Sequence, residues 1–107
     1  MTSFSDKERA EEAKYAFDEE TLFRITARRN RLLGHWAAEK MGLTAVEAEG
    51  YAKEVIQADF EEAGDEDVIR KVLGDLIAAG CDVEESAIRS ALEAKMIEAR
   101  RALMGGV

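Results

Sequence analysis

The sequence lacks proline altogether, and its 107 residues include only one cysteine, one histidine and one tryptophan. The single cysteine, Cys81, allows no internal disulfide, and a single histidine, His35, argues against the usual zinc sites, which need several histidine or cysteine ligands. Aromatic residues make up only 7%, whereas alanine, glutamate, arginine, lysine and leucine are abundant. Because these abundant residues favour helices, the composition predicts an all-α fold.

The chain is acidic, with a formal net charge of −8. Such a charge argues against general nucleic-acid binding and against adhesion to anionic membranes, because both would have to overcome repulsion. The charged start MTSFSDKERAEE does not resemble a signal peptide. No apolar run approaches the roughly 18 residues that a transmembrane helix needs. We therefore expect a cytoplasmic protein that binds no nucleic acid and does not insert into a membrane.

Helix-start and helix-stop signals divide most of the chain into four helices, at about residues 20–41, 44–63, 65–79 and 83–104. Thr44 with Glu47 forms a capping box, Asp65 is placed to cap the third helix, and Gly42, Gly64 and Gly80 are placed as stops. Short connections predict antiparallel neighbours, and residues 19–107 are therefore expected to form one four-helix bundle.

Apolar residues at helical spacing predict the core of this bundle. The first helix is expected to bury Leu22, Ile25, Leu32 and Trp36, with Phe23, Leu33, Ala37 and Met41 on the flanks. The later helices are expected to bury Ala48, Tyr51, Ala52, Val55, Ala58, Phe60, Val68, Val72, Leu73, Leu76, Ile77, Ile88, Leu92, Met96, Ala99 and Leu103. Gly34, Gly50 and Gly74 lie inside helices, where close approach of a neighbour is one reason for glycine and chance is the other.

Residues 1–18 differ from the bundle. Ser5 and Glu8 form a capping-box pattern, but large apolar groups are scarce, since Ala10, Ala13 and Phe17 are the residues at matching spacing. Short helices without tertiary support are marginal in water. The sequence therefore predicts a mobile, conditionally helical segment, and an ordinary frayed terminus is the alternative.

The candidates for chemistry are few. The acidic run from Asp59 to Asp67 fails as a calcium loop, because Ala63 and Arg70 stand where oxygen ligands are required. No phosphate-binding glycine loop occurs. The basic stretch consists of Arg24, Arg28, Arg29 and Arg31, of which Arg24, Arg28 and Arg31 share a helix face. It predicts either a contact to a phosphate or acidic partner or pairing with the acidic run inside the fold. We expect no enzyme, no metal site, and surface or rim positions for His35.

Three segments, ERAEEAKYAFDEE, RRNRLLGHWAAEKMGLT and YAKEVIQADFEEAGDEDVIRKV, carry a family resemblance in their order and spacing. They resemble the alphaproteobacterial zeta subunit, the ATPase inhibitor of the F-type ATP synthase. The likeness is strongest from Glu8 to Val72 and weaker over the last helix. Two departures are His35, where an apolar residue is expected, and Ser5, where an acid is expected.

The resemblance implies a four-helix bundle preceded by an inhibitory segment. In that family the segment becomes helical and inserts at a catalytic α/β interface of the synthase head, near γ, which blocks ATP hydrolysis. The resemblance implies that the residues of this chain that contact the synthase head are Phe4, Asp6, Lys7, Glu8, Arg9, Glu12, Lys14, Tyr15 and Phe17.

The resemblance also implies weak adenine-nucleotide binding, without assigned residues, and no other cofactor. The alternative function is a small bundle that responds to ADP or ATP through the arginine face and inhibits nothing. We expect a monomer when free, associated through the synthase with the cytoplasmic face of the inner membrane.

Overall fold

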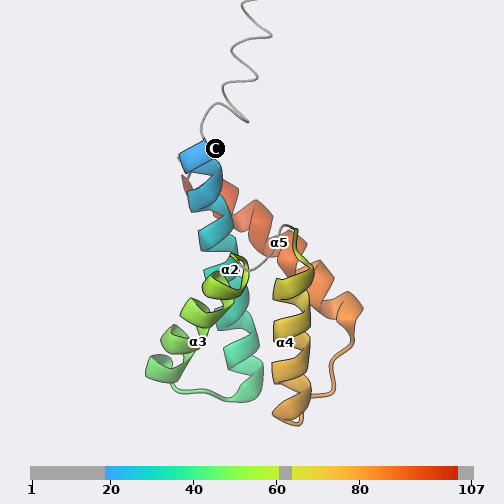
Figure 1. The fold of residues 1–107 in the computed structure, drawn as a ribbon. Coiled ribbons are helices and arrows are strands. Elements are labelled where there is room, and N and C mark those ends of the chain that lie inside the picture. Colours follow the sequence, from blue (N-terminus) through green and yellow to red (C-terminus); the bar gives the residue numbers. More distant parts are fainter. Residues whose placement is uncertain (1–18, 61–63, 104–107) are drawn as a thin grey trace, which may run out of the picture.

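The computed structural model describes residues 19–60 and 64–103, which form four α-helices (Figure 1). The helices are α2 (Glu19–Met41), α3 (Ala45–Ala58), α4 (Glu66–Ala78) and α5 (Glu85–Leu103). The predicted all-α four-helix fold is confirmed. The prediction for residues 1–18 lies outside the described residues.

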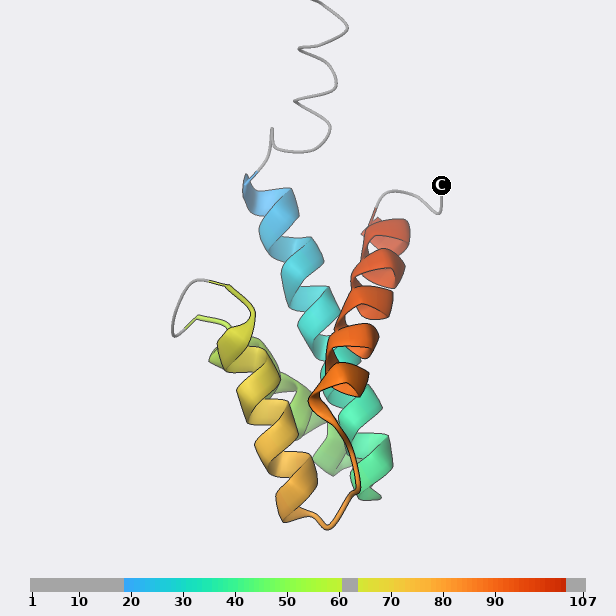
Figure 2. The ribbon, with the colours of Figure 1, turned by 90° about the vertical axis from the view of Figure 1, so that its right-hand side faces the viewer.

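The long helix α2 is the element on which the others assemble, and α3 and α5 make the most extensive contacts with it. Successive helices run in opposite directions, as the short connections predicted (Figure 1). In both views the N-terminal half of α2 and the C-terminal half of α5 extend beyond α3 and α4 (Figure 2). The first turns of α2 are therefore covered by fewer neighbours than the rest of that helix.

Large aliphatic side chains from all four helices fill the core. Those fully removed from solvent are Leu33, Val55, Val68, Val72, Leu76 and Ile88. Burial of one such side chain stabilises the fold by about 1.5–3 kcal/mol. These positions were predicted, except that Leu33 was placed on the flank of the first helix.

The buried face of α2 differs from the predicted one. It consists of Ile25, Arg29, Asn30, Leu33, Gly34, Ala37 and Ala38. Of the four residues predicted at its centre, Ile25 is buried, Leu32 and Trp36 are partly buried, and Leu22 is exposed. Trp36 packs against the core from its edge, whereas the predicted burial of Leu22 is wrong. The predicted burial of Phe60, Ile77 and Leu103 is also wrong, since all three are exposed.

Gly34 marks the closest approach between α2 and α3. A Cβ atom built at Gly34 would lie 2.7 Å from the Cα atom of Ala52, which is closer than real Cβ contacts. The same construction at Gly50 and Gly74 meets nothing within 4 Å. Close approach therefore explains the glycine at position 34 and leaves the other two without a packing reason.

The predicted helix ends are partly confirmed. Thr44 and Glu47 form the capping box, in which the Glu47 N–H donates to Thr44 Oγ1 at 3.2 Å and the Thr44 N–H donates to Glu47 Oε1 at 2.9 Å. Gly42 has a φ of 73°, a conformation that favours glycine at a helix stop. Asp65 occupies the predicted N-cap position of α4, but its side chain makes no hydrogen bond to the first turn.

The second helix is shorter than predicted. It ends at Ala58 rather than near residue 63, and the N–H groups of Asp59 and Phe60 donate to the carbonyls of Ile56 and Gln57, in a tighter turn. This turn carries Asp59 toward α2, where it meets a buried arginine.

Candidate functional site

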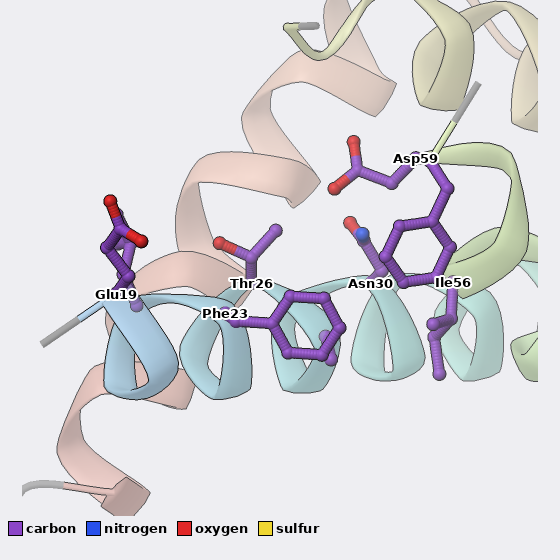
Figure 3. A pocket seen from close by; sticks show the side chains of 9 residues that line it. Glu19, Phe23, Thr26, Asn30, Ile56 and Asp59 are labelled. Atoms are coloured by element: carbon purple, nitrogen blue, oxygen red, sulfur yellow. The ribbon is translucent and has the colours of Figure 1, made fainter. Parts of the chain in front are cut away.

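A groove of about 430 Å³ lies between the N-terminal half of α2 and the C-terminal end of α3 (Figure 3). Its walls are mainly apolar, and its polar groups lie along the rim and floor. The lining residues are Glu19, Leu22, Phe23, Thr26, Ala27, Asn30, Ile56, Asp59 and Phe60.

An aromatic pair forms one wall of this groove. The rings of Phe23 and Phe60 stack with centroids 5.5 Å apart and planes inclined by 21°. Both remain in contact with solvent, with 53% of Phe23 and 60% of Phe60 exposed, and the neighbouring Leu22 is 45% exposed. Contiguous exposed apolar groups of this kind are typical of a binding surface. The sequence analysis placed all three in the core.

A buried guanidinium supports the floor of the groove. Arg29 is only 4% exposed, and its Nε and one terminal nitrogen donate to Asn30 Oδ1 at 3.0 and 2.8 Å. Its terminal nitrogens also lie 3.0 Å from Asp65 Oδ1 and 3.9 Å from Asp59 Oδ2. This Arg29 network joins α2 to the end of α3 and the start of α4. The Asp59 carboxylate therefore faces Arg29, next to the turn that carries Phe60.

The three arginines predicted to share a contact face occupy separate environments. Arg24 pairs with Glu20 on the surface, and Arg31 binds both carboxylate oxygens of Glu49. Arg28 is exposed and makes no ion pair with a described residue. None of these three pairs with Asp59, Asp65, Glu66 or Asp67, the described carboxylates of the acidic run. The member of the basic stretch that meets the run is Arg29, which pairs with Asp59 and Asp65, so the predicted internal pairing is confirmed for this residue.

A second hollow, between α2, α4 and α5, is more polar than the groove. Arg89 bridges Glu66 of α4 and Glu85 of α5, with distances of 2.9 and 2.7 Å. The hydrogen bond from Arg89 lowers the pKa of Glu66 below its usual range. Because four of its lining charges are paired, Arg29 with Asp65 and Arg89 with Glu66, this hollow offers a less available site than the groove.

Comparison with known proteins identifies the family of the chain. Residues 1–102, nearly the whole chain, match the family described as ATPase inhibitor subunit zeta. The chain belongs to this family. A protein structure solved by solution NMR is 48% identical in sequence, with a TM-score of 0.70, and the match covers 79% of this chain and 96% of that one. No curated protein matches the chain.

Membership in the zeta family confirms the resemblance found in the sequence and supports an inhibitory role at the ATP synthase. An inhibitor subunit is a regulatory protein rather than a catalyst. In residues 19–60 and 64–103, no group of three or more potential metal ligands occurs. The described helices include none that is both long enough and apolar enough to cross a membrane.

The predicted inhibitory contacts of this zeta-family chain lie outside the described residues. They are Phe4, Asp6, Lys7, Glu8, Arg9, Glu12, Lys14, Tyr15 and Phe17. What the structure adds is the position of the bundle's first residue, Glu19, which follows this segment directly and lines the groove.

The single histidine lies in a surface cluster rather than in a catalytic arrangement. His35 Nε2 is 3.5 Å from Glu49 Oε2, and the His35 side chain is 37% exposed, which confirms the predicted rim position. The hydrogen bond from Arg31 is the largest cause of a lowered pKa at Glu49, to which the charges of Arg31 and His35 also contribute. The Cys81 thiol, which is half-buried, donates to the carbonyl of Lys40 at 3.4 Å.

Proposed function

We propose that this zeta-family protein inhibits ATP hydrolysis by the catalytic head of the F-type ATP synthase, through insertion of residues 1–18 at a catalytic α/β interface near γ. The observation that carries the proposal is the family match, which begins at residue 1 and therefore includes the segment together with the bundle. The nine contact candidates, from Phe4 to Phe17, would meet the α, β and γ subunits.

The composition of the segment supports this division of labour. Lys7 and Glu11, and Lys14 and Asp18, stand four positions apart, where opposite charges stabilise a helix by a few tenths of a kcal/mol. The same segment offers few large apolar groups for packing on its own bundle. A partner would supply the missing contacts, as in other segments that fold on binding.

The bundle supports the proposal as a separate positioning unit. Among the described residues the buried core begins at Ile25 and ends at Ala99. The core positions therefore lie well after residue 18 in the chain. We propose that residues 19–107 fold as one domain and hold the segment at the synthase.

The test is ATP hydrolysis by the purified synthase head of the same organism, measured with the full-length protein and with a truncation that lacks Met1–Phe17. We expect inhibition by the full-length protein alone, and nearly unchanged thermal melting of the helical signal in the truncation. Inhibition by the truncation, or loss of its cooperative melting, would contradict the division between segment and bundle.

Point substitutions sharpen this test. Replacement of both Tyr15 and Phe17 by serine removes two contact candidates, whereas Ala13→Ser changes a neighbouring position that is not among them. We expect the double variant to need a much higher concentration for half-inhibition and the control to match the unmodified protein. Equal potency of the two would place the inhibitory contacts elsewhere.

A further inference from the structure

The exposed apolar residues of the described part are unevenly distributed. Seven large apolar side chains are at least 38% exposed: Leu22, Phe23, Val46, Phe60, Ile77, Ile97 and Leu103. Three of them, Leu22, Phe23 and Phe60, line one groove, whereas the others lie at the start of α3, the end of α4 and along α5. Single exposed apolar residues are common, but a group around a concave surface indicates binding.

The groove is tied by the chain itself to the proposed inhibitory segment. Glu19 lines the groove and is the residue next to position 18. Leu22 and Phe23 follow position 18 by four and five residues, a separation of about 6–8 Å along a helix and at most about 18 Å for any backbone. If residues 1–18 occupy a catalytic interface, the groove must therefore lie at the mouth of that interface.

The chemistry of the groove defines what it would hold. Figure 3 shows the carboxylates of Glu19 and Asp59 toward opposite ends of the groove, with Phe23 between them. Because Asp59 already faces Arg29, the exposed Glu19 carboxylate is the acidic group available to a partner, and apolar walls beside it suit an apolar side chain that has a lysine or arginine next to it. The net charge of −8 on the chain favours the same kind of basic partner.

The walls of the groove are also held in place before any partner arrives. Asn30 on the floor is 1% exposed and accepts two hydrogen bonds from Arg29, which also faces Asp59. Phe23 and Phe60 hold each other by stacking. A surface ordered in advance loses less conformational entropy on binding, and aromatic groups are frequent among the residues that dominate binding energy.

From these observations we infer that the groove between α2 and α3 is a second docking surface for the synthase head. It binds an apolar side chain flanked by a basic residue on the head, at the mouth of the interface that receives residues 1–18. The inference rests on the proposed function and extends it, because it assigns part of the binding to the bundle.

The test compares two sets of exposed apolar residues in the full chain. Phe23→Ser combined with Phe60→Ser removes the aromatic wall, and Val46→Ser combined with Ile77→Ser is the matched control on other surfaces. Glu19→Lys is a second groove variant that keeps the aromatic stack. Half-inhibitory concentration, maximal inhibition and equilibrium binding are measured with the purified synthase head, and circular dichroism checks folding.

We expect both groove variants to raise the half-inhibitory concentration, by about 10–30-fold for the aromatic pair. Maximal inhibition at saturation should stay unchanged, because residues 1–18 are intact. The control should lie within about two-fold of the unmodified protein, which is the scatter expected for surface substitutions. This pattern would separate docking by the groove from blockage by the segment.

The failures of the two proposals are distinguishable. If the unmodified protein inhibits and the folded groove variants inhibit equally well, the docking surface is wrong and the proposed function stands. If the unmodified protein does not inhibit, the proposed function fails. The equilibrium binding of the groove variants to the synthase head then tests whether the groove is a docking surface. Binding weakened by the groove substitutions would still support the docking surface, whereas binding that is absent or unaffected would overturn it.

Discussion

The carboxylate of Asp65 lies 3.0 Å from the guanidinium of Arg29, and the first turn of α4 is left without a side-chain cap. A helix cap is worth about 1 kcal/mol. A buried charge that loses its partner costs about 3–5 kcal/mol. The tertiary ion pair therefore outweighs the local preference of an aspartate for the start of a helix. This relationship ties the start of α4 to α2, and Arg29 also faces Asp59 at the end of α3.

The first prediction concerns Arg29. Arg29→Met keeps a long side chain but removes the hydrogen bonds to Asn30 and the charge facing Asp59 and Asp65. We expect the free energy of unfolding to fall by about 2–4 kcal/mol, somewhat less than for a fully buried pair because Asp65 is partly exposed. Urea denaturation followed by circular dichroism measures this loss.

Arg24→Ala is the matched control for Arg29. It removes an ion pair with Glu20 in which both side chains are more than 60% exposed. Surface pairs of this kind contribute about 0–1 kcal/mol. A similar loss of unfolding free energy in both variants would mean that burial does not make the Arg29 network more stabilising than a surface ion pair.

The helices were predictable because their signals are local. The capping box of Thr44 and Glu47 and the stop at Gly42 involve neighbours in sequence, and both are confirmed. The buried face of α2 was not predictable in the same way. Apolar spacing does not point to Arg29 and Asn30, because both are polar. In the fold Arg29 donates to Asn30 and faces Asp59, just after α3, and Asp65, just before α4.

The groove escaped prediction for a different physical reason. Leu22, Phe23 and Phe60 are apolar residues at helical spacing, and that spacing alone predicts burial. Whether an apolar side chain is covered depends on how far the neighbouring helices extend. Because α2 projects beyond α3 and α4 at its N-terminal end, its first turns stay partly exposed (Figure 2). The tight turn after Ala58 brings Phe60 to Phe23.

The second prediction uses the three glycines inside helices. Gly34→Ala should destabilise the fold by about 1–3 kcal/mol, because its Cβ would press on the backbone of Ala52. Gly50→Ala and Gly74→Ala should instead stabilise it by about 0.5–1 kcal/mol, since their surroundings are open and alanine favours the helix. Urea denaturation of the three variants checks the signs. A stabilising Gly34→Ala would show that the approach of α3 to α2 relaxes at little cost.

The third prediction concerns Tyr51, which is 7% exposed and donates a hydrogen bond from its hydroxyl to Asp75 Oδ2 at 2.8 Å. Burial, followed by this hydrogen bond, raises the pKa of Tyr51 above its usual value of 10.0. In the unfolded chain the phenol ionises near that usual value. The stability that arises from the raised pKa is therefore fully present below about pH 10 and is lost as the pH rises beyond it.

Tyr51→Phe isolates this contribution, because it retains the ring beside Lys71 and removes the hydroxyl. At neutral pH the variant should be less stable by about 1 kcal/mol, the usual net value of a hydrogen bond. Above pH 10 the difference should shrink, since only the unmodified protein has a phenol at position 51 whose ionisation favours the unfolded state. Urea denaturation at neutral and alkaline pH measures both differences. A gap that stays constant with pH would show that the Tyr51 hydroxyl titrates alike in the folded and unfolded chains.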